Sequence, residues 1–446
     1  MMERKLLTTF IINLRNRFDR KVHILNEFND RYEFDIQVIE AVENSTGAIG
    51  LWESIKKIVK QAVETGEEKI LICEDDHLFT GSYNESLLQE AIQEGNQLGA
   101  EVICGGVSWY QDMLPVTGHL NWTNKFSGTQ FVIIYKSLFS KILGTDFSNR
   151  DSADYKLCSL TDKTFFIYPF ISVQKDFGYS DVTAANDGVR SVESLFAATI
   201  ARLEMYSKIK EHYNTLPLVA EDNEAYEDLS LPTYVINLPE RTERLEHIKL
   251  QFENRPEFDV TIVEACKHPV GAVGLWMSIR KVIQMAVDNE DDVIIICEDD
   301  HTFTPEYSRD YLFRNLLEAN AQGADYLSGG PSTFMDAVPV SANRYWVSSC
   351  QATQFVIIYR DLFERILNKE FDDTIIADLC LSGMITNKMV LWPAVSMQKD
   401  FGYSDVTPAH NDQKDLVQRL FNEARERFEK INRSRKTFHP EPAGIL

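Results

Sequence analysis

The chain has 446 residues, of which 44% are hydrophobic and 25% are charged. This composition is typical of folded globular proteins and excludes a disordered or fibrous class, and the length suits two or three domains rather than one. The formal net charge of -23 disfavours nucleic acids and anionic membrane surfaces as partners, because an acidic protein repels phosphate groups.

Strand and helix patterns alternate along the first half of the chain. In chain order they predict a strand at 10–14, a helix at 16–28, a strand at 34–42, a helix at 49–65, a strand at 69–73, a helix at 85–98 and a strand at 101–104. This alternation indicates an α/β fold in which a mostly parallel sheet is flanked by helices. Ligands of such sheets bind beyond the carboxyl ends of the strands.

The second half of the chain repeats the first at a constant offset of 224 residues. Three segments carry the repeat: ICEDDH at 72–77 and 296–301, TQFVIIY at 129–135 and 353–359, and QKDFGYSDVT at 174–183 and 398–407. Copies of this size are too long for solenoid repeats, so we interpret them as two domains. A helical pattern at 188–213 and an acidic stretch at 221–230 separate them. We predict a first domain at 1–215, a linker at 216–231 and a second domain at 232–446.

Nothing in the sequence indicates export or membrane insertion. The N-terminal residues lack the cleavage site of a signal peptide, and no stretch approaches the roughly 18 apolar residues of a membrane span. The seven cysteines lack CxxC spacing, and Cys73 and Cys297 lie within apolar runs, which favours buried thiols over disulfides or zinc sites. We expect a cytoplasmic protein without a transmembrane segment, and the sequence leaves the oligomeric state open.

An acidic cluster follows the same apolar strand in both copies. It consists of Glu74, Asp75 and Asp76 in the first copy and of Glu298, Asp299 and Asp300 in the second. Three adjacent carboxylates repel one another unless a hard divalent cation binds them. Alternate residues of an extended segment face the same way, so the first and third carboxylates can share a metal while the middle one turns aside. A solvated acidic turn is the alternative, which the recurrence in both copies disfavours.

Polar and basic residues follow the first strand of each copy. They are Asn13, Leu14, Arg17 and Arg20, matched by Asn237, Leu238, Arg241 and Arg244. Guanidinium groups beside a helix N-terminus can bind a phosphate or a carboxylate. Ion pairs with nearby surface acids are the alternative. Together with the acidic cluster, the arginines suggest a nucleoside diphosphate held between a metal and guanidinium groups.

These motifs resemble those of glycosyltransferase family 25, which includes bacterial lipopolysaccharide galactosyltransferases and collagen galactosyltransferases. The resemblance covers residues 8–183 and 233–407. It rests on IINLRNRFDR at 11–20 and VINLPERTER at 235–244, on GAIGLWESIKKIVKQAVETG at 47–66, on the strand with EDD, and on an aspartate after TQFVIIY.

The resemblance implies a nucleotide-sugar-binding fold of the GT-A type in each copy, with Mn or Mg bound by the EDD motif. It also implies inverting transfer of a sugar such as galactose from a nucleotide sugar, which we expect to be UDP-linked, to a hydroxyl of a glycan acceptor in cell-surface polysaccharide synthesis. Asp154 and Asp378 stand where the family carries an aspartate before a helix, so they are the first candidates for the catalytic base. Asp181 and Asp405, within GYSDVT, are the second.

One helix departs from the family pattern. Where many members read Gly-Cys-x-x-Ser-His, Leu51 and Ile55 replace the Cys and His in the first copy, and Leu275 and Ile279 replace them in the second. This loss supports an alternative function, a non-catalytic tandem protein that binds sugars or nucleotides in degenerate active sites. In a third hypothesis one copy is active and the other is a scaffold. His77 and His301, which follow the acidic cluster, either assist the metal or simply pack locally.

Overall fold

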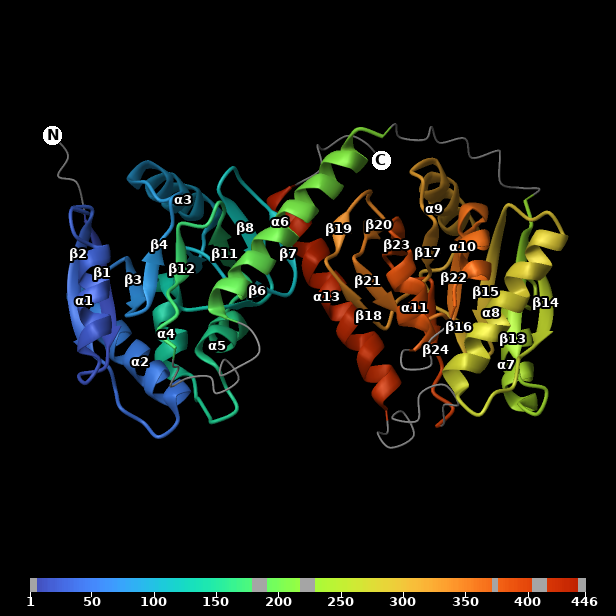
Figure 1. The fold of residues 1–446 in the computed structure, drawn as a ribbon, viewed down its shortest axis with the longest axis horizontal. Helices are drawn as coiled ribbons and strands as arrows, with labels where there is room; N and C mark the ends of the chain where they lie inside the picture. Colours follow the sequence, from blue (N-terminus) through green and yellow to red (C-terminus); the bar gives the residue numbers. More distant parts are fainter. Residues whose placement is uncertain (1–5, 179–190, 217–228, 371–375, 403–414, 440–446) are drawn as a thin grey trace. The chain divides into compact units, whose positions relative to one another are not determined.

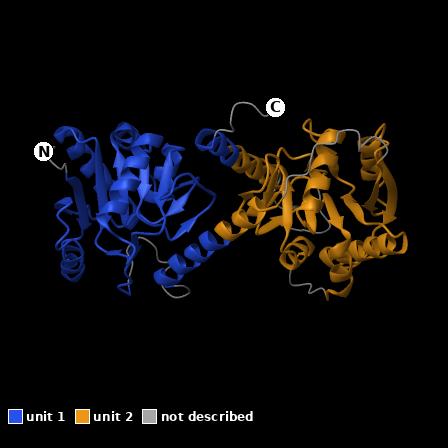
Figure 2. Ribbon diagram, turned by 90° about the horizontal axis from the view of Figure 1, so that it is seen from above, with its two compact units in different colours: residues 1–205, 430–446 blue, residues 206–429 orange. Residues whose placement is uncertain are grey.

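The computed structural model describes residues 6–178, 191–216, 229–370, 376–402 and 415–439 (Figure 1). They form two compact units, residues 1–205 with 430–446 and residues 206–429 (Figure 2). The predicted domain boundaries at 1–215 and 232–446 stay a prediction, and residues 217–228 of the predicted linker lie outside the described residues.

The elements of the first copy follow the predicted alternation of strands and helices. Its strands are β1 Leu7–Asn13, β2 Phe34–Glu40, β3 Lys69–Glu74, β4 His77–Phe79, β5 Val102–Cys104, β6 Trp109–Tyr110, β7 Met113–Pro115, β8 Leu120–Thr123, β9 Phe126–Ser127, β10 Phe131–Tyr135, β11 Thr164–Ile167 and β12 Ser172–Gln174. Its helices are α1 Phe18–Glu27, α2 Gly47–Thr65, α3 Glu85–Leu98, α4 Lys136–Gly144, α5 Ala153–Leu160 and α6 Val192–Asn214.

The second copy repeats this order. Its strands are β13 Leu231–Asn237, β14 Phe258–Glu264, β15 Val293–Glu298, β16 His301–Phe303, β17 Tyr326–Ser328, β18 Thr333–Met335, β19 Val338–Pro339, β20 Arg344–Trp346, β21 Ser349–Gln351, β22 Phe355–Tyr359, β23 Lys388–Leu391 and β24 Ser396–Gln398. Its helices are α7 Thr242–Phe252, α8 Gly271–Asp288, α9 Arg309–Ala321, η3 Arg360–Leu362, α10 Phe363–Asn368, α11 Ala377–Met384 and α13 Leu416–Phe438.

Each unit contains an eight-stranded sheet with helices packed beside it (Figure 1). The strand order is β2-β1-β3-β10-β5-β11-β8-β7 in the first copy and β14-β13-β15-β22-β17-β23-β20-β19 in the second. The predicted α/β class is therefore confirmed. The sheet is more mixed than predicted, because β10 runs against both β3 and β5, and β8 runs against both β11 and β7.

The pairing brings one set of strand ends to a single edge of each sheet. β1 runs parallel to β2 and β3, with Ile12 opposite Glu74, so their carboxyl ends share an edge. The antiparallel β10 begins at that edge, where Phe131 lies opposite Cys73. The second copy has the same register, with Ile236 opposite Glu298.

Apolar side chains at helical spacing hold the helices on these sheets. In α2, Ile55, Ile58, Val59 and Ala62 are buried, and they are the positions that the helical period places on one face. Six of the seven cysteines are buried and all are free, as the sequence predicts. None of the helices in the described part of the chain combines the length and the apolar composition that a membrane crossing requires.

Candidate functional site

The middle aspartate of each acidic cluster forms hydrogen bonds to the end of the first strand of its copy and to the helix that follows that strand. Asp75 accepts hydrogen bonds from Asn13 Nδ2 at 2.8 Å and from Arg20 Nη1 at 3.2 Å. Asp299 accepts from Asn237 Nδ2 at 2.8 Å and from Arg244 Nη1 at 3.0 Å. Both oxygens of each carboxylate thus accept from protein groups. Such buried, charge-assisted bonds fix the backbone at the end of the strand.

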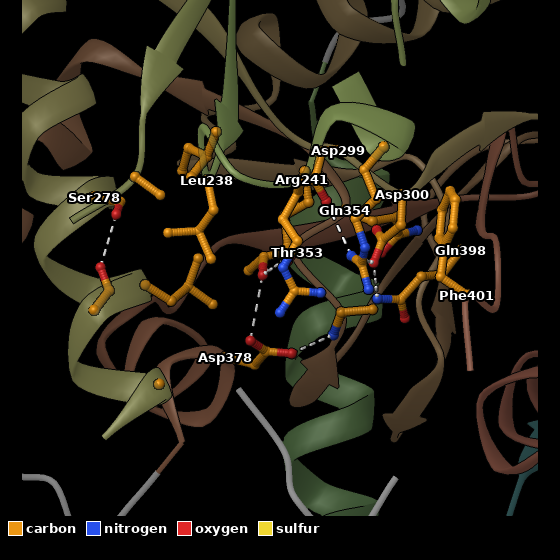
Figure 3. Close-up of a pocket in the computed structure, with 18 of the residues that line it drawn as sticks. Leu238, Arg241, Ser278, Asp299, Asp300, Thr353, Gln354, Asp378, Gln398 and Phe401 are labelled. Carbon is orange, nitrogen blue, oxygen red and sulfur yellow. Dashed lines mark hydrogen bonds and ion pairs between the residues drawn. The ribbon is translucent and has the colours of Figure 1, made fainter. Parts of the chain in front are cut away.

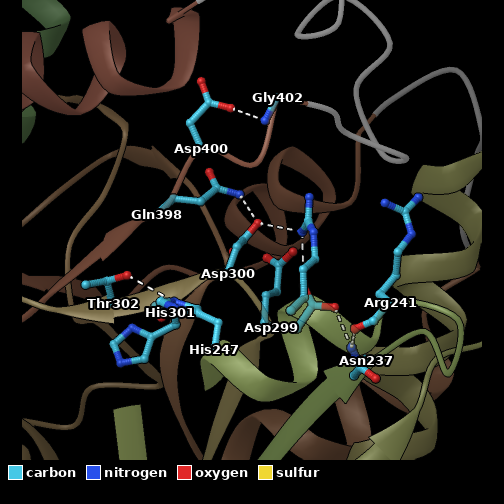
Figure 4. Close-up of polar contacts among 12 residues, drawn as sticks. Asn237, Arg241, His247, Asp299, Asp300, His301, Thr302, Gln398, Asp400 and Gly402 are labelled. Carbon is cyan, nitrogen blue, oxygen red and sulfur yellow. Dashed lines mark hydrogen bonds and ion pairs between the residues drawn. The ribbon is translucent and has the colours of Figure 1, made fainter. Parts of the chain in front are cut away.

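The third aspartate keeps one oxygen without a protein partner. Asp300 Oδ2 accepts from Gln398 Nε2 at 2.8 Å and from Arg244 Nη1 at 3.1 Å, whereas the buried Oδ1 has no hydrogen-bond partner (Figure 4). Asp76 resembles it, with Oδ2 3.5 Å from Arg20 Nη1 and a buried, unpartnered Oδ1. Burial raises the pKa of Asp300 to about 6 and, together with the charge of Asp75, that of Asp76 to about 6.

A threonine links the first carboxylate of the cluster to the predicted base. Thr353 Oγ1 is 2.6 Å from Glu298 Oε1 and 3.3 Å from Asp378 Oδ1 (Figure 3). In the first copy Thr129 Oγ1 lies 2.5 Å from Glu74 Oε1. Burial, followed by the neighbouring Asp76, raises the pKa of Glu74 to about 8. Burial and Asp300 likewise raise the pKa of Glu298 well above its ordinary value.

The predicted bases lie in the first turn of a short helix in each copy. Asp154, in α5, accepts from Ser127 Oγ at 2.9 Å and from the Gly128 and Tyr155 amides. Asp378, in α11, accepts from the Ala352 amide at 2.8 Å. The structure thus brings Asp378 close to Glu298. The second candidates, Asp181 and Asp405, lie outside the described residues.

A cavity opens beside these carboxylates in each copy, at equivalent positions. Its volume is about 480 Å³ in the second copy and about 380 Å³ in the first. The shared lining includes Leu14 and Leu238, Arg17 and Arg241, Gly50 and Gly274, Leu51 and Leu275, and Glu74 and Glu298. Asp300 and Asp378 also line the cavity of the second copy (Figure 3).

The two arginines of each pair differ in their surroundings. Arg17 lines the cavity of the first copy, and Arg241 and Arg244 both line that of the second. Arg20 is buried with its guanidinium group against Asp75 and Asp76, and Arg244 contacts Asp299 and Asp300 in the same way. A guanidinium group that already neutralises two carboxylates has less capacity for a phosphate.

A serine that the sequence analysis did not single out shapes the cavity wall. Ser54 Oγ donates to the Gly50 carbonyl at 2.7 Å and accepts from the Val42 amide at 2.8 Å. The two hydrogen bonds connect the loop after β2 to α2. Ser278 makes the same pair of bonds in the second copy. Thr129 and Thr353 were also missed. The recurrence of TQFVIIY could have identified the two threonines. The serine of the family pattern Gly-Cys-x-x-Ser-His could have identified Ser54 and Ser278.

The residues that replace the family's Cys and His lie in two different environments. Leu51 and Leu275 line the cavities, so an apolar side chain stands where the family carries a thiol. Ile55 and Ile279 are buried in the core.

The two histidines after the acidic cluster are core residues. His77 Nδ1 is 2.8 Å from Ser172 Oγ, and His301 Nδ1 is 2.7 Å from Ser396 Oγ, and both rings pack among phenylalanines. Burial lowers the pKa of His77 to about 3, so the ring is neutral at pH 7.

No protein-family model and no curated protein matches the chain. Among solved structures, the protein A197 from STIV is similar with a TM-score of 0.29 and 15% identity over 39% of this chain and 86% of that one. An apo UDP-glucose pyrophosphorylase has a TM-score of 0.27 and 13% identity over 45% and 82%. A UDP-glucose pyrophosphorylase complexed with UDP-glucose has a TM-score of 0.26 and 13% identity over 46% and 83%. All three TM-scores are below 0.5, so we base no conclusion on them.

Proposed function

We propose that this protein is a metal-dependent glycosyltransferase that resembles glycosyltransferase family 25. It would transfer a sugar such as galactose, with inversion, from a UDP-sugar to a hydroxyl of a glycan acceptor in cell-surface polysaccharide synthesis, for example of lipopolysaccharide. The observation that supports this proposal best is that Glu298, Asp300 and Asp378 line one cavity together with Arg241.

The oxygen ligands suit a divalent cation such as Mn or Mg. Among the described residues no group of three or more His, Cys, Asp or Glu side chains is arranged to hold a metal. A hard cation that binds a nucleotide commonly takes only one or two carboxylates and completes its coordination with phosphate oxygens. The buried, unpartnered Oδ1 atoms of Asp76 and Asp300 fit that role. Glu74 with Asp76, and Glu298 with Asp300, would hold the ion.

The residues that line the cavity would have different roles in the reaction. A bound cation would stabilise the negative charge of the departing diphosphate. Arg241 would bind the diphosphate from the cavity wall, and Arg17 would do so in the first copy. Asp378 would take the proton of the acceptor hydroxyl as its oxygen forms a bond to the anomeric carbon and the bond to the diphosphate breaks. Asp154 would have the same role in the first copy.

One observation favours the alternative of a tandem binding protein without turnover. Leu51 and Leu275 line the cavities where the family has cysteine, and Ile55 and Ile279 put an apolar side chain where it has histidine. If that histidine is essential to the reaction, donor binding would remain and transfer would not.

Release of UDP from UDP-sugars in the presence of Mn distinguishes the two functions. The proposal predicts turnover with a glycan acceptor, and its loss in the double variant Asp76→Ala with Asp300→Ala. A donor that raises the melting temperature with Mn but yields no UDP would favour the binding protein. A screen of UDP-, GDP- and CDP-sugars would identify the nucleotide.

A further inference from the structure

The repeated sequence QKDFG begins beside the acidic cluster in both copies. We call residues 174–178 and 398–402 the QKDFG segments. Gln398 pairs with His301 in the short ladder of β16 and β24, and the Lys399 amide donates to the Asp300 carbonyl at 2.8 Å. Asp400 Oδ1 accepts from the Gly402 amide at 2.7 Å, which closes a turn with a left-handed glycine (Figure 4). The segment is thereby fixed to the backbone of the carboxylate.

The phenylalanine of the segment packs on the arginine that neutralises the aspartates. The Arg244 guanidinium carbon lies 4.8 Å from the centre of the Phe401 ring, and the His247 ring lies 5.5 Å from it. Arg244 and His247 are three residues apart and so share one face of α7. An aromatic ring over a guanidinium group attracts it electrostatically and restricts its plane.

The first copy repeats this packing with its own residues. The Arg20 guanidinium carbon lies 4.7 Å from the centre of the Phe177 ring, and the centre of the His23 ring lies 5.4 Å from it. The Lys175 amide donates to the Asp76 carbonyl at 2.8 Å. Both copies therefore repeat the packing of the phenylalanine on the arginine and the backbone hydrogen bond to the third aspartate, together with the sequence of the segment.

We infer that the QKDFG segment positions the third aspartate of the cluster for metal binding, an inference that rests on the proposed function. Phe401 holds the Arg244 guanidinium group against Asp299 and Asp300, and Gln398 donates to Asp300 Oδ2. Both bonds engage the same oxygen of Asp300 and leave Oδ1 for a cation. Without these two bonds the Asp300 side chain could rotate and present either oxygen. The binding of the ion would then have to order the side chain, which would lower the affinity.

The two copies provide a matched pair of glutamines for the test. Gln398 donates to Asp300 at 2.8 Å, whereas Gln174 makes no hydrogen bond to Asp76, although the structure describes both residues. Gln398→Leu should therefore weaken one metal site, and Gln174→Leu should weaken neither.

Titration of the full chain with Mn²⁺, followed by electron paramagnetic resonance of the free ion, measures this effect without any substrate. Wild-type protein should bind two ions. Gln398→Leu and Phe401→Leu should each lower the affinity for one of them by about 10-fold, the lower end of the range for groups that orient a metal ligand. Phe401→Tyr keeps the ring and should keep the affinity. Unfolding curves confirm that the variants are folded.

The outcomes separate this inference from the proposed function. Unchanged affinity for both ions in folded Gln398→Leu and Phe401→Leu proteins would overturn the positioning role and leave the metal site in place. Equal weakening by Gln174→Leu would also overturn it, because the effect would not depend on the bond to the carboxylate. Failure of the wild-type chain to bind Mn²⁺ even when UDP is present would instead contradict the metal-dependent function itself.

Discussion

The three consecutive carboxylates of each cluster have three different environments. Glu298 contacts a threonine, Asp299 is saturated by Asn237 and Arg244, and Asp300 retains a buried oxygen without a partner. The sequence predicts the cluster and that its middle residue turns aside. It could not predict which arginine would neutralise the aspartates, because Arg241 and Arg244 are separated by one turn of chain and only the packing of α7 distinguishes them.

The role of the predicted base is tested by a change that conserves its size. Asp378→Asn should lower kcat by roughly 10²- to 10⁴-fold, because an amide cannot accept the proton of the acceptor hydroxyl. The affinity for UDP should not change. Steady-state rates and UDP titrations measure both quantities on a variant in which the first copy is disabled by Asp154→Asn. The surface variant Asp361→Asn is the control, and an unaltered kcat would exclude Asp378 as the base.

The buried histidines predict a dependence of stability on pH. The folded pKa of His77 is about 3, below its ordinary value of 6.5, so the unfolded chain binds protons at a higher pH than the folded chain. The contribution of His77 to stability is therefore complete above pH 6.5 and is lost as the pH drops toward 3, by about 1.4 kcal/mol per pH unit. His77→Asn retains a polar partner for Ser172 but does not titrate. Urea unfolding at pH 5.5 and 4.5 should show a smaller loss for this variant, and equal losses would contradict the assignment.

At the scale of elements, the cavity depends on a close contact between helix and loop. The start of α2 approaches the loop after β2 so closely that a Cβ atom on Gly50 would lie 2.5 Å from the Val42 carbonyl oxygen. A Cβ atom on Gly274 would lie 2.7 Å from that of Cys266. Ser54 and Ser278 bond across the same junction. This contact holds the cavity wall in place.

Gly274→Ala should destabilise the protein by about 1–3 kcal/mol, because the added methyl group pushes the loop away from α8. It should also weaken donor binding, since Cys266 and Lys267 line the cavity. Gly144→Ala is the matched control, because nothing lies within 4 Å of a Cβ atom there. Urea unfolding compares the two, and equal stability of both variants would show that the junction tolerates a side chain.

The helices were easier to predict than the strand directions. The pattern at 85–98 matches α3 at both ends, since Asn84 caps the helix and Gly99 ends it in a left-handed conformation. No strand was predicted at FVIIY, which forms β10, and its burial leaves no pattern that would show that it runs against its neighbours. The short strands β6 to β9 were missed, since they consist of two to four residues each.

At the scale of the whole molecule, the constant offset of 224 residues reproduces a sheet, a cavity and an acidic cluster in each copy. We expect the two sites to work independently. Asp76→Ala and Asp300→Ala should each leave part of the transferase activity, and the double variant should leave none, since independent sites contribute additively. Initial rates of the three variants test this. If one single variant abolishes all activity, only that copy is catalytic.

Calorimetric titration of the full chain with UDP, with and without Mn²⁺, tests the central claim most directly. The cavity of the second copy combines Arg241 with Glu298 and Asp300, and that of the first combines Arg17 with Glu74. We predict that two UDP molecules bind per chain when Mn²⁺ is present and that binding is much weaker without it, because the ion offsets the repulsion between the diphosphate and the acidic cluster. No detectable binding of UDP in the presence of Mn²⁺, or binding of equal strength without it, would contradict the account.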